Sequence, residues 1–454
     1  MRGGRSLLLL MAVALGLGAY IYFVESERDP VATDAKEKIF TIDRAAVTEL
    51  RIKSSSAQAT TLRRTGDEWA LIDPVAAPAD SATIDAILST LDAVEIDRVL
   101  DENPTALAQF GLEVPTVEVT AIAGATTHVL SLGIDTPTGT GLYARANGNP
   151  RLLLVPSFHK ASLDKATFDL RNRQALAVNR DTADRVSLAP RGGAVIELRR
   201  EGVNWQLSAP VAARADFSPT DGLIGRLATA QMSSIVLEGT EPTPAQLRTY
   251  GLDNPQLTAS IGTGSSMATL ALGAAKDDTS IYARDLSRPI IFTVDASLLT
   301  DLRKEPADLR VRDIFEFNAF SAMTLDVAHG TTAVAFAKSA TAPSGTDAAA
   351  ISTWARTRPT AGDVNQTALT DLLNALSSLR ADQFVSQVPA TGDTVEVTVQ
   401  FGTPDAAREE RATLRRSGNT SYAIRPGEPG AAVITADGFD AVLTSLKTLT
   451  TSAQ

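Results

Sequence analysis

The sequence predicts an α+β protein built from tandem repeats of one unit, in which antiparallel strands are covered by a few packed helices, after one N-terminal transmembrane helix. Three observations predict this class. Motifs recur at a nearly constant offset, short segments of alternating polarity open each copy, and amphipathic helical stripes are few. A doubly wound parallel sheet is disfavoured, because the strands do not alternate with long helices.

Residues 6–24 form an almost unbroken apolar run. As a helix with a rise of about 1.5 Å per residue it spans roughly 28 Å, close to the hydrocarbon thickness of a bilayer. Arg2 and Arg5 precede it, and basic flanks stay in the cytoplasm. We therefore expect residues 1–24 to form a cytoplasmic tip and an anchor in the bacterial inner membrane. A cleaved signal peptide is the alternative, although the run ends in aromatic residues instead of a small-residue cleavage site.

Composition limits what the rest of the chain can do. Its 454 residues are enough for about three domains, and hydrophobic residues make up 44% of them. The absence of cysteine excludes disulfides, thiol catalysis and thiolate metal sites, and three histidines disfavour a multi-histidine metal centre. The net charge of −11 argues against a nucleic-acid partner.

Six motifs recur in one order at offsets of 136 to 140 residues. The first set comprises Trp69, Ala79-Asp80, Phe110-Gly111-Leu112, Leu132-Gly133, Tyr143-Ala144-Arg145 and Asp169-Leu170-Arg171. The second set comprises Trp205, Ala215-Asp216, Tyr250-Gly251-Leu252, Leu272-Gly273, Tyr282-Ala283-Arg284 and Asp308-Leu309-Arg310. A degenerate third set retains Trp354, Asp363, Tyr422-Ala423 and Arg425, without the two glycine motifs.

The repeats divide the chain. After a linker at 25–38 we expect three copies at 39–176, 177–314 and 315–454. The offset from Trp205 to Trp354 is longer than the offset from Trp69 to Trp205. We interpret the small-residue stretch at 340–350 as a loop insertion that accounts for the difference.

Each copy opens with predicted strands, at 47–53, 60–64 and 68–72 in the first copy and at 185–188, 194–199 and 204–207 in the second. Turn residues such as Gly66 and Gly202 separate them, which indicates an antiparallel meander. A helix with one apolar stripe follows. We expect Asp80 or Ser81 to cap it in the first copy, and Ser218, followed by Pro219, in the second. The stripes comprise Ile84, Ile87, Leu88, Leu91 and Val94, then Leu223, Leu227 and Ala230, then Leu369, Leu372, Leu373, Leu376 and Leu379.

A two-turn helix comes next in the first two copies. Asn103-Pro104 and Thr243-Pro244 begin it, and Gly111 and Gly251 end it. Four short strands follow, at 117–122, 128–132, 142–146 and 152–155 in the first copy. A closing helix carries Phe158 and Leu163, its counterparts Leu298, Leu299 and Leu302, and in the third copy Phe439, Val442, Leu443 and Leu446.

The order and duplication of these motifs resemble the bacterial domain of unknown function 4340 (DUF4340) family, in tandem copies. The resemblance covers residues 40–315 well and 316–454 poorly. It implies a membrane-attached extracytoplasmic protein associated with ABC transporter systems of the gliding-motility type, beside an auxiliary subunit. The family brings no established catalytic residues.

Signatures of catalysis are not found in the sequence. It contains no Walker A motif and no nucleophile elbow, and its three histidines are isolated from one another. The glycines at 262–264 fit a hairpin turn better than a phosphate-binding loop.

The repeated polar and aromatic residues are the candidate binding residues: Tyr143, Arg145, Tyr282, Arg284, Trp69 and Trp205. A Tyr-x-Arg spacing puts both side chains on one strand face, where the arginine can bind a ligand or a partner. The structural alternative is an arginine paired with Asp80, Asp216 or Asp363, or an arginine whose stem lies over the tyrosine. The tryptophans are either core anchors or platforms for sugars. For Arg171 and Arg310, near the ends of the copies, we expect ion pairs between copies.

We therefore expect a non-enzymatic, single-pass inner-membrane protein without a cofactor, its N-terminus cytoplasmic and its bulk periplasmic. It would serve as an accessory or scaffold component of an envelope or ABC-transporter-type complex, with a permease or auxiliary subunit as partner. A periplasmic module that binds polysaccharide or peptide is the alternative, and an envelope hydrolase is a third.

Overall fold

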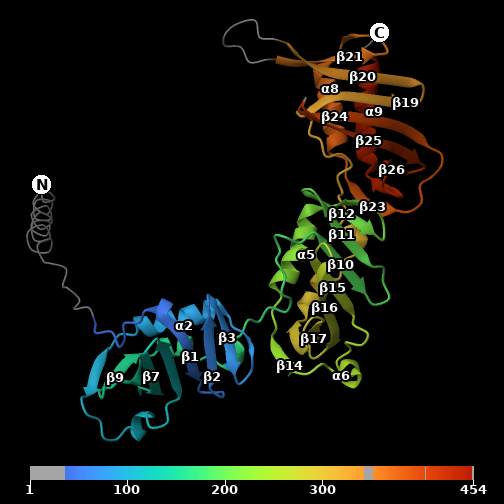
Figure 1. Ribbon diagram of the computed structural model, residues 1–454. Helices are drawn as coiled ribbons and strands as arrows, with labels where there is room; N and C mark the ends of the chain where they lie inside the picture. The colour runs from blue at the N-terminus through green and yellow to red at the C-terminus, as the bar shows by residue number, and fades with distance from the viewer. Residues whose placement is uncertain (1–35, 342–350, 404, 452–454) are drawn as a thin grey trace, which may run out of the picture. The chain divides into compact units, whose positions relative to one another are not determined.

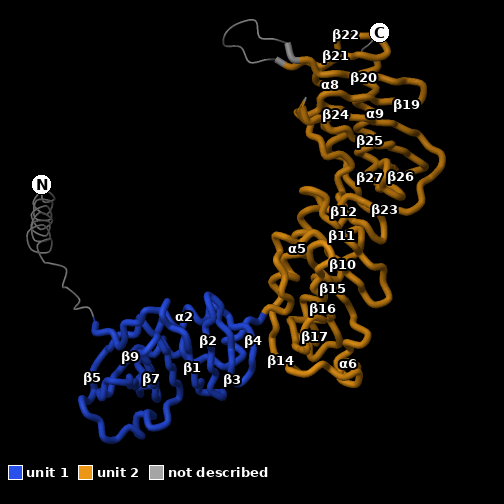
Figure 2. Tube along the Cα trace, viewed as in Figure 1, with its two compact units in different colours: residues 1–173 blue, residues 174–454 orange. Residues whose placement is uncertain are grey.

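The computed structural model describes residues 36–341, 351–403 and 405–451 (Figure 1). The expected membrane anchor and nearly all of the expected linker lie outside these residues. Within the described ranges, no helix is both long and apolar enough to cross a membrane. The chain divides into two compact units, Met1–Arg173 and Gln174–Gln454 (Figure 2).

In the described part of the chain, three nine-stranded sheets with one strand order make up the fold. The first runs β4-β3-β2-β1-β6-β7-β8-β9-β5, and β10–β18 and β19–β27 repeat this order. The paired strands are antiparallel, as in the ladders between β1 and β6, β10 and β15, and β19 and β24. The predicted class of repeated antiparallel sheets with few helices is confirmed.

The strand bounds follow the repeats. The first sheet comprises β1 (Val47–Lys53), β2 (Thr60–Thr65), β3 (Glu68–Asp73), β4 (Ala77–Pro78), β5 (Arg98–Asp101), β6 (Val117–Ala123), β7 (Thr126–Asp135), β8 (Gly141–Ala146) and β9 (Leu152–Pro156). The second comprises β10 (Arg185–Pro190), β11 (Ile196–Glu201), β12 (Asn204–Ala209), β13 (Ala213–Ala215), β14 (Ser234–Glu238), β15 (Leu257–Thr263), β16 (Ser266–Ala275), β17 (Ser280–Asp285) and β18 (Ile290–Asp295). The third comprises β19 (Ala322–His329), β20 (Thr332–Thr341), β21 (Ile351–Arg358), β22 (Gly362–Asp363), β23 (Ala381–Val385), β24 (Asp393–Thr403), β25 (Ala406–Ser417), β26 (Thr420–Ile424) and β27 (Ala431–Ile434).

One long helix follows the fourth strand of each sheet: α2 (Ser81–Ala93), α5 (Phe217–Thr229) and α8 (Gln366–Ser377). The side chain of Asp80 caps α2 as predicted, accepting a hydrogen bond from the backbone N–H of Thr83. The predicted cap of α5 at Ser218 is wrong. Asp216 accepts from the N–H of Ser218, so this helix begins at Phe217 and carries Pro219 inside its first turn.

Short helices close the first two copies: α3 (His159–Leu163) and α4 (Thr167–Leu170), then α7 (Ser297–Leu302) and the 3₁₀ turn η4 (Pro306–Asp308). The third copy closes with the longer helix α9 (Ala436–Thr451). A further 3₁₀ turn, η2 (Arg44–Ala46), precedes β1. In the third copy α8 and α9 cover the same face of the sheet (Figure 1).

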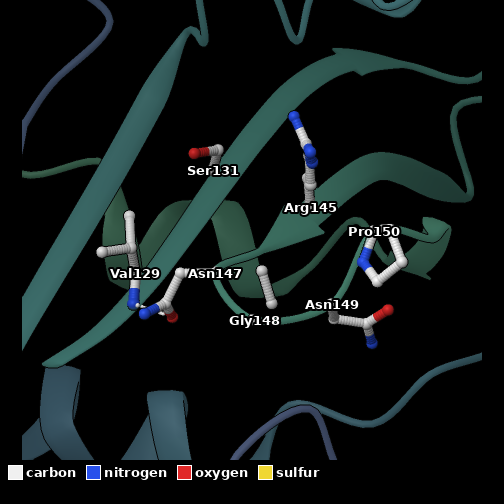
Figure 3. A pocket seen from close by; sticks show the side chains of 8 residues that line it. Val129, Ser131, Arg145, Asn147, Gly148, Asn149 and Pro150 are labelled. Atoms are coloured by element: carbon white, nitrogen blue, oxygen red, sulfur yellow. Dashed lines mark hydrogen bonds between the residues drawn. The ribbon is translucent and has the colours of Figure 1, made fainter. Parts of the chain in front are cut away.

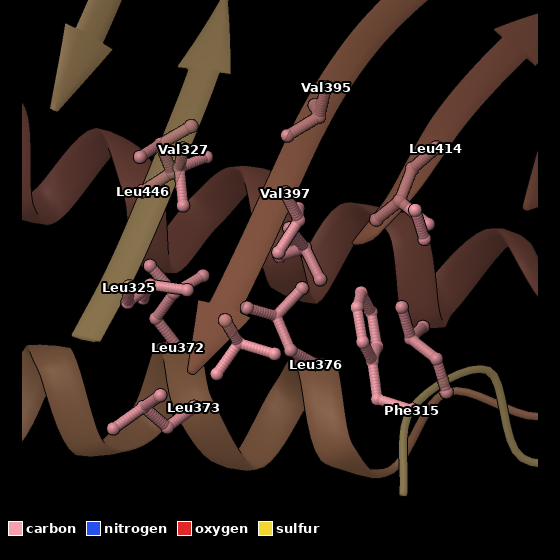
Figure 4. Close-up of a cluster of buried hydrophobic side chains, with 14 of the residues drawn as sticks. Phe315, Leu325, Val327, Leu372, Leu373, Leu376, Val395, Val397, Leu414 and Leu446 are labelled. Carbon is pink, nitrogen blue, oxygen red and sulfur yellow. The ribbon is translucent and has the colours of Figure 1, made fainter. Parts of the chain in front are cut away.

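In the core of the third copy, alternate apolar residues of the strands pack against the helices. Alternate residues of β19 and β24, among them Leu325 and Val397, face Leu372 and Leu376 of α8 (Figure 4). Phe315, which precedes the sheet, is fully buried in the same cluster. Burying one such side chain stabilises the fold by about 1.5–3 kcal/mol.

The predicted two-turn helix forms in only one copy. In the second copy α6 (Pro244–Thr249) has a capping box in which Thr243 and Gln246 bind each other's backbone N–H. The first copy has a single 3₁₀ turn, η3 (Ala108–Phe110), at this place. Ala106 stands where Gln246 stands in the second copy, and its methyl group cannot accept a hydrogen bond from the N–H of the capping residue. The prediction of a two-turn helix was therefore wrong for this copy.

The two glycine motifs pack on each other. Gly111 has φ 67°, and a Cβ added to Gly133 would lie 2.0 Å from the carbonyl oxygen of Phe110. In the second copy a Cβ on Gly273 would lie 2.4 Å from the carbonyl oxygen of Tyr250. The third copy lacks both motifs, and its β25–β26 ladder has no register shift like those of β7–β8 and β16–β17.

Candidate functional site

The tryptophans are core residues. Trp69, Trp205 and Trp354 are buried beneath their sheets. These residues are at most 7% exposed, which disfavours the sugar platform considered for Trp69 and Trp205. They act as core anchors.

The tyrosines of the Tyr-Ala-Arg motif pack against the glycine turn. The ring of Tyr143 lies 4.9 Å from that of Phe110, and the ring of Tyr282 lies 4.7 Å from that of Tyr250. Both tyrosines are partly buried. The motif thus fastens the turn to the sheet, and its recurrence has a packing explanation.

The two repeated arginines differ. Arg284 forms an ion pair with Glu241, which precedes α6. Arg145 is exposed on β8, and its guanidinium has no hydrogen-bond or ion-pair partner among the described residues. It lines a pocket of about 420 Å³ together with Ser131 and Asn147 (Figure 3). Of the six predicted binding residues, Arg145 and Trp205 line hollows, Trp205 a smaller one of about 190 Å³ in the second copy.

The predicted pairing of these arginines with repeated aspartates is wrong. Asp80 and Asp216 are occupied as helix caps. The assignment of Arg425 as the third counterpart of Arg145 is also wrong by one residue. Arg145 pairs across the ladder with Ser131, and the equivalent pair of the third sheet is Thr413 with Ile424.

The larger candidate site is a cleft of about 720 Å³ in the second compact unit, between the second and third sheets. From the second sheet come the ends of β12 and β13, the N-cap of α5 and the exposed ring of Phe217. From the third come the start of β25 and the end of β26. We call this hollow the charged cleft. Its charged lining residues are Arg214, Arg408, Arg425, Asp216, Asp313, Glu316, Glu409 and Glu410.

Arg214 is the hub of the charged cleft. It extends from the edge strand β13, and its Nε donates to Glu428 at 3.0 Å, its Nη1 to Glu316 at 2.8 Å and its Nη2 to the carbonyl oxygen of Asp313 at 2.9 Å. Glu428 lies in the β26–β27 turn of the third copy. One side chain of the second sheet therefore binds two segments of the chain beyond it: the connection that contains Asp313 and Glu316, and the β26–β27 turn.

Arg310 completes the junction. Its guanidinium stacks on the ring of Phe384 with its Cζ 3.7 Å from the ring centroid, and its Nη2 donates to Glu428 at 2.9 Å. The expected ion pair between copies is confirmed for Arg310. Arg171 in the first unit is buried.

Arg425 is a largely buried lining residue of the cleft. It donates to the carbonyl oxygen of Ile314 and, at 3.2 Å, to Glu410, whose other oxygen accepts from the backbone N–H of Glu316 at 2.8 Å. Burial, together with the charge of Arg214, lowers the pKa of Arg425. It stays charged at any physiological pH because the pKa of a guanidinium is so high.

The electrostatics hold Glu316 ionised. Burial raises the pKa of its carboxyl group, but a hydrogen bond from Arg214 and the charges of Arg214, Arg408 and Arg425 outweigh this, and the net pKa lies below the ordinary value. A carboxylate in this state is suited to binding cations and backbone N–H groups. It is poorly suited to act as a general acid near neutral pH.

In the second and third copies, an arginine binds backbone carbonyl oxygens of the segment that precedes the sheet. The arginine and its acidic partner occupy opposite positions in the two copies. In the second copy the buried Asp285 pairs with Arg288, whose Nη2 donates to the carbonyl oxygens of Gln174 and Ala175. In the third copy an arginine, Arg425, stands at the place of Asp285, and a glutamate stands three residues on. This reversal gives the third copy a glutamate that can reach Arg214 and Arg310.

Within the described ranges, no three histidine, aspartate or glutamate side chains converge in a way that could hold a metal ion. The charged cleft offers paired ions, exposed backbone and one aromatic ring. Those groups can bind a polypeptide or another charged chain.

Sequence reasoning singled out Asp216 and Arg425 but missed the other charged residues of the charged cleft. Glu316, Glu410 and Glu428 belong to the poorly matching third copy and have no counterparts of the same type in the other copies. Arg214 replaces Pro78 of the first copy. The signal that could have found them is the opposite of repetition: charged residues at positions where the other copies carry different ones.

The family comparison agrees with the repeats. The family described as a domain of unknown function, DUF4340, matches two tandem segments, residues 69–204 and 205–404, which together cover well over half of the chain. The chain belongs to this family, and the resemblance drawn from the motifs is confirmed. Each matched segment begins at a core tryptophan. No curated protein and no solved structure matches the chain.

Proposed function

We propose that the chain is a non-enzymatic, membrane-anchored extracytoplasmic protein that serves as an accessory or scaffold component of an envelope or ABC-transporter-type complex. The charged cleft carries this proposal. The recurring tryptophans and tyrosines are used in packing, whereas the charged cleft is built from residues particular to one junction and opens to solvent. The anchor at 6–24 and the periplasmic location are part of the proposal, and the apolar run with its basic flank supports them.

Co-purification tests the proposal. The full chain with a C-terminal tag is expressed in its host, and the membranes are solubilised in mild detergent. We expect the chain in the membrane fraction, accessible to protease from the periplasm, and isolated together with a transporter permease or an auxiliary subunit. A chain recovered from the soluble cytoplasmic fraction, or isolated from membranes with no membrane partner, contradicts the proposal.

A matched pair of variants connects the result to the charged cleft. Phe217 lines the cleft and is 63% exposed, and Phe158 is 70% exposed in the first unit. Neither ring is needed in the core, so Phe217→Ser and Phe158→Ser should fold equally well. We expect Phe217→Ser to reduce partner recovery several-fold and Phe158→Ser to leave it unchanged.

The alternative, a periplasmic ligand-binding module, is favoured by one observation: the unpaired Arg145 in its pocket of about 420 Å³. An anionic group of a polysaccharide or a peptide would suit an arginine fork there. Calorimetry with anionic oligosaccharides tests it, with Arg145→Gln as the variant. Equal binding by both proteins, or none by either, removes this alternative.

A further inference from the structure

The first strand of the β25–β26 hairpin extends well beyond its partner. β25 pairs with β24 along its full length, from Ala406 to Arg416, whereas β26 pairs with it only between Thr413 and Ser417. Residues 406–412 therefore form a sheet edge. Among the described residues, no backbone hydrogen bond covers this edge on the side away from β24.

The first copy covers the corresponding edge. After β8 the chain continues along β7: the backbone N–H of Asn147 donates to the carbonyl oxygen of Val129, and its side chain binds the N–H of Val129 and the carbonyl oxygen of Thr127. In the second copy the N–H of Leu286 donates to the carbonyl oxygen of Thr269 in the same way.

The third copy cannot make this contact, because Pro426 stands at the place of Asn147 and Leu286 and has no N–H. In this register Arg411 and Glu409 correspond to Val129 and Thr127. The backbone groups of these two residues therefore point out of the sheet edge. The N–H and C=O groups of Ala407 do the same, because an antiparallel strand alternates its bonding direction residue by residue.

The edge opens into the charged cleft, since Arg408, Glu409 and Glu410 are among its lining residues. Seven residues of strand span about 23 Å, room for a segment of similar length. Carboxylates outnumber arginines in this cleft. The lining contains three arginines against five carboxylates, so the cleft as a whole favours a positively charged occupant.

A second copy of the chain is the competing occupant of this edge. Antiparallel pairing puts outward-facing residues opposite one another, so Glu409 of one copy would face either Glu409 or Arg411 of the other. The first register puts like charges directly across the ladder and the second puts opposite charges there, so light scattering must test for dimers paired through this edge.

We propose that an extended, basic segment of a partner protein adds to the β25 edge as a further strand, with its lysines or arginines directed at the carboxylates of the charged cleft. The inference rests on the proposed function as a binding scaffold, and it names the chemistry of the partner and the way in which it is held. Main-chain hydrogen bonds supply the affinity, and charge supplies the choice of partner.

The probe is a fluorescein-labelled nine-residue peptide of alternating lysine and valine, titrated into the purified full chain and followed by fluorescence anisotropy. Two matched peptides accompany it: one N-methylated at alternate residues, which cannot form a ladder on one side, and one with glutamate in place of lysine. We expect the lysine peptide to bind, both matched peptides to bind at least tenfold more weakly, and binding to protect the amides of residues 407–411 from hydrogen exchange.

Two substitutions locate the binding. Glu409→Pro removes an edge-facing N–H while sparing the ladder with β24, and Glu409→Thr is its control, which keeps the N–H and removes the same charge. Pro426→Asn restores the residue that covers the edge in the first copy. We expect Glu409→Pro and Pro426→Asn to weaken binding at least tenfold more than Glu409→Thr does, with unchanged circular dichroism and thermal midpoint.

Several results overturn the strand addition: no binding by the folded chain, equal binding of the N-methylated peptide, binding indifferent to Glu409→Pro and Pro426→Asn, or light scattering that shows dimers paired through this edge. These results leave the proposed function standing if membrane partners still co-purify. Peptide binding by a chain that co-purifies with no membrane partner overturns the proposed function instead.

Discussion

At the scale of single residues, glycine determines whether the repeated turn can lie against the sheet. The carbonyl oxygen of Tyr250 lies so close to Gly273 that a side chain at residue 273 would clash with it. Gly251 in the turn has φ 66°, which favours glycine. The tyrosine of the Tyr-Ala-Arg motif then covers the turn. Three motifs that are separate in the sequence therefore form one contact.

Gly273→Ala should destabilise the second copy, because its Cβ would lie 2.4 Å from a backbone oxygen and either the turn or the strand must move. We expect a loss of about 1–3 kcal/mol in the free energy of unfolding, measured by urea titration. Gly222→Ala, in the interior of α5 with open space around it, is the matched control and should stabilise by about 0.5–1 kcal/mol. Losses of equal size at both positions would contradict this account.

The same scale shows what repetition in the sequence can reveal. Trp69, Asp80 and Gly133 recur in the second copy because core filling, helix capping and close packing are needed in both of these copies, and so their structural roles could be predicted in part. The role of Arg145 could not, because its counterpart Arg284 finds a partner in Glu241 while Arg145 does not. A side chain's partner depends on residues far away in the sequence.

At the scale of elements, strands with clear alternation were predictable. The segment 47–53 was expected and found as β1, and 60–64 differs from β2 by one residue. β5 and its counterparts were missed. β5 has only four residues, largely exposed, and is held by β9 alone at the sheet edge, so local patterning carries no signal for it. Edge strands of this kind owe their structure to the neighbour that they meet.

The ion network of the charged cleft joins two sheets through one turn. Glu428→Ala would leave Arg214 and Arg310 without the carboxylate that they share, and uncompensated buried charge is costly. We expect a loss of about 3–5 kcal/mol in the unfolding free energy of the second compact unit, followed by tryptophan fluorescence in urea.

The control for that measurement is Glu241→Ala. Glu241 also pairs with an arginine, but its side chain is 69% exposed, against 15% for Glu428. Exposed pairs contribute about 1 kcal/mol or less. If the two substitutions cost the same, the network does not hold the junction as described.

At the scale of the whole molecule, ionised carboxylates join segments in both compact units. Burial raises the pKa of Asp164, but hydrogen bonds from Ser55 and Ser54 and the charge of Lys160 outweigh it, so the pKa is lowered. These bonds tie the end of α3 to the chain after β1. Glu316 has the same balance of causes in the second unit.

Stability should therefore fall in acid in both units. Because the folded-state pKa values of Asp164 and Glu316 lie below those of the unfolded chain, each carboxylate stabilises the fold above about pH 5. That contribution is lost as the pH falls through the folded-state values. We expect the urea midpoint to be similar at pH 7 and pH 5.5 and lower at pH 3. Asp164→Asn and Glu316→Gln should flatten this dependence, and a profile that both variants leave unchanged would contradict it.

The segment between the second and third sheets has a mechanical consequence. Residue 310 bridges to Ala215 of the second sheet, and three residues later Asp313 bridges to Arg380 of the third. The N–H groups of Val311 and Ile314 bind the carbonyl oxygens of Arg214 and Leu379 in the same order. A pull along the chain would therefore load these bonds together in shear, before either sheet could begin to unravel. If the protein is held at one end and pulled at the other, these bonds at the junction would carry the force between the second and third sheets.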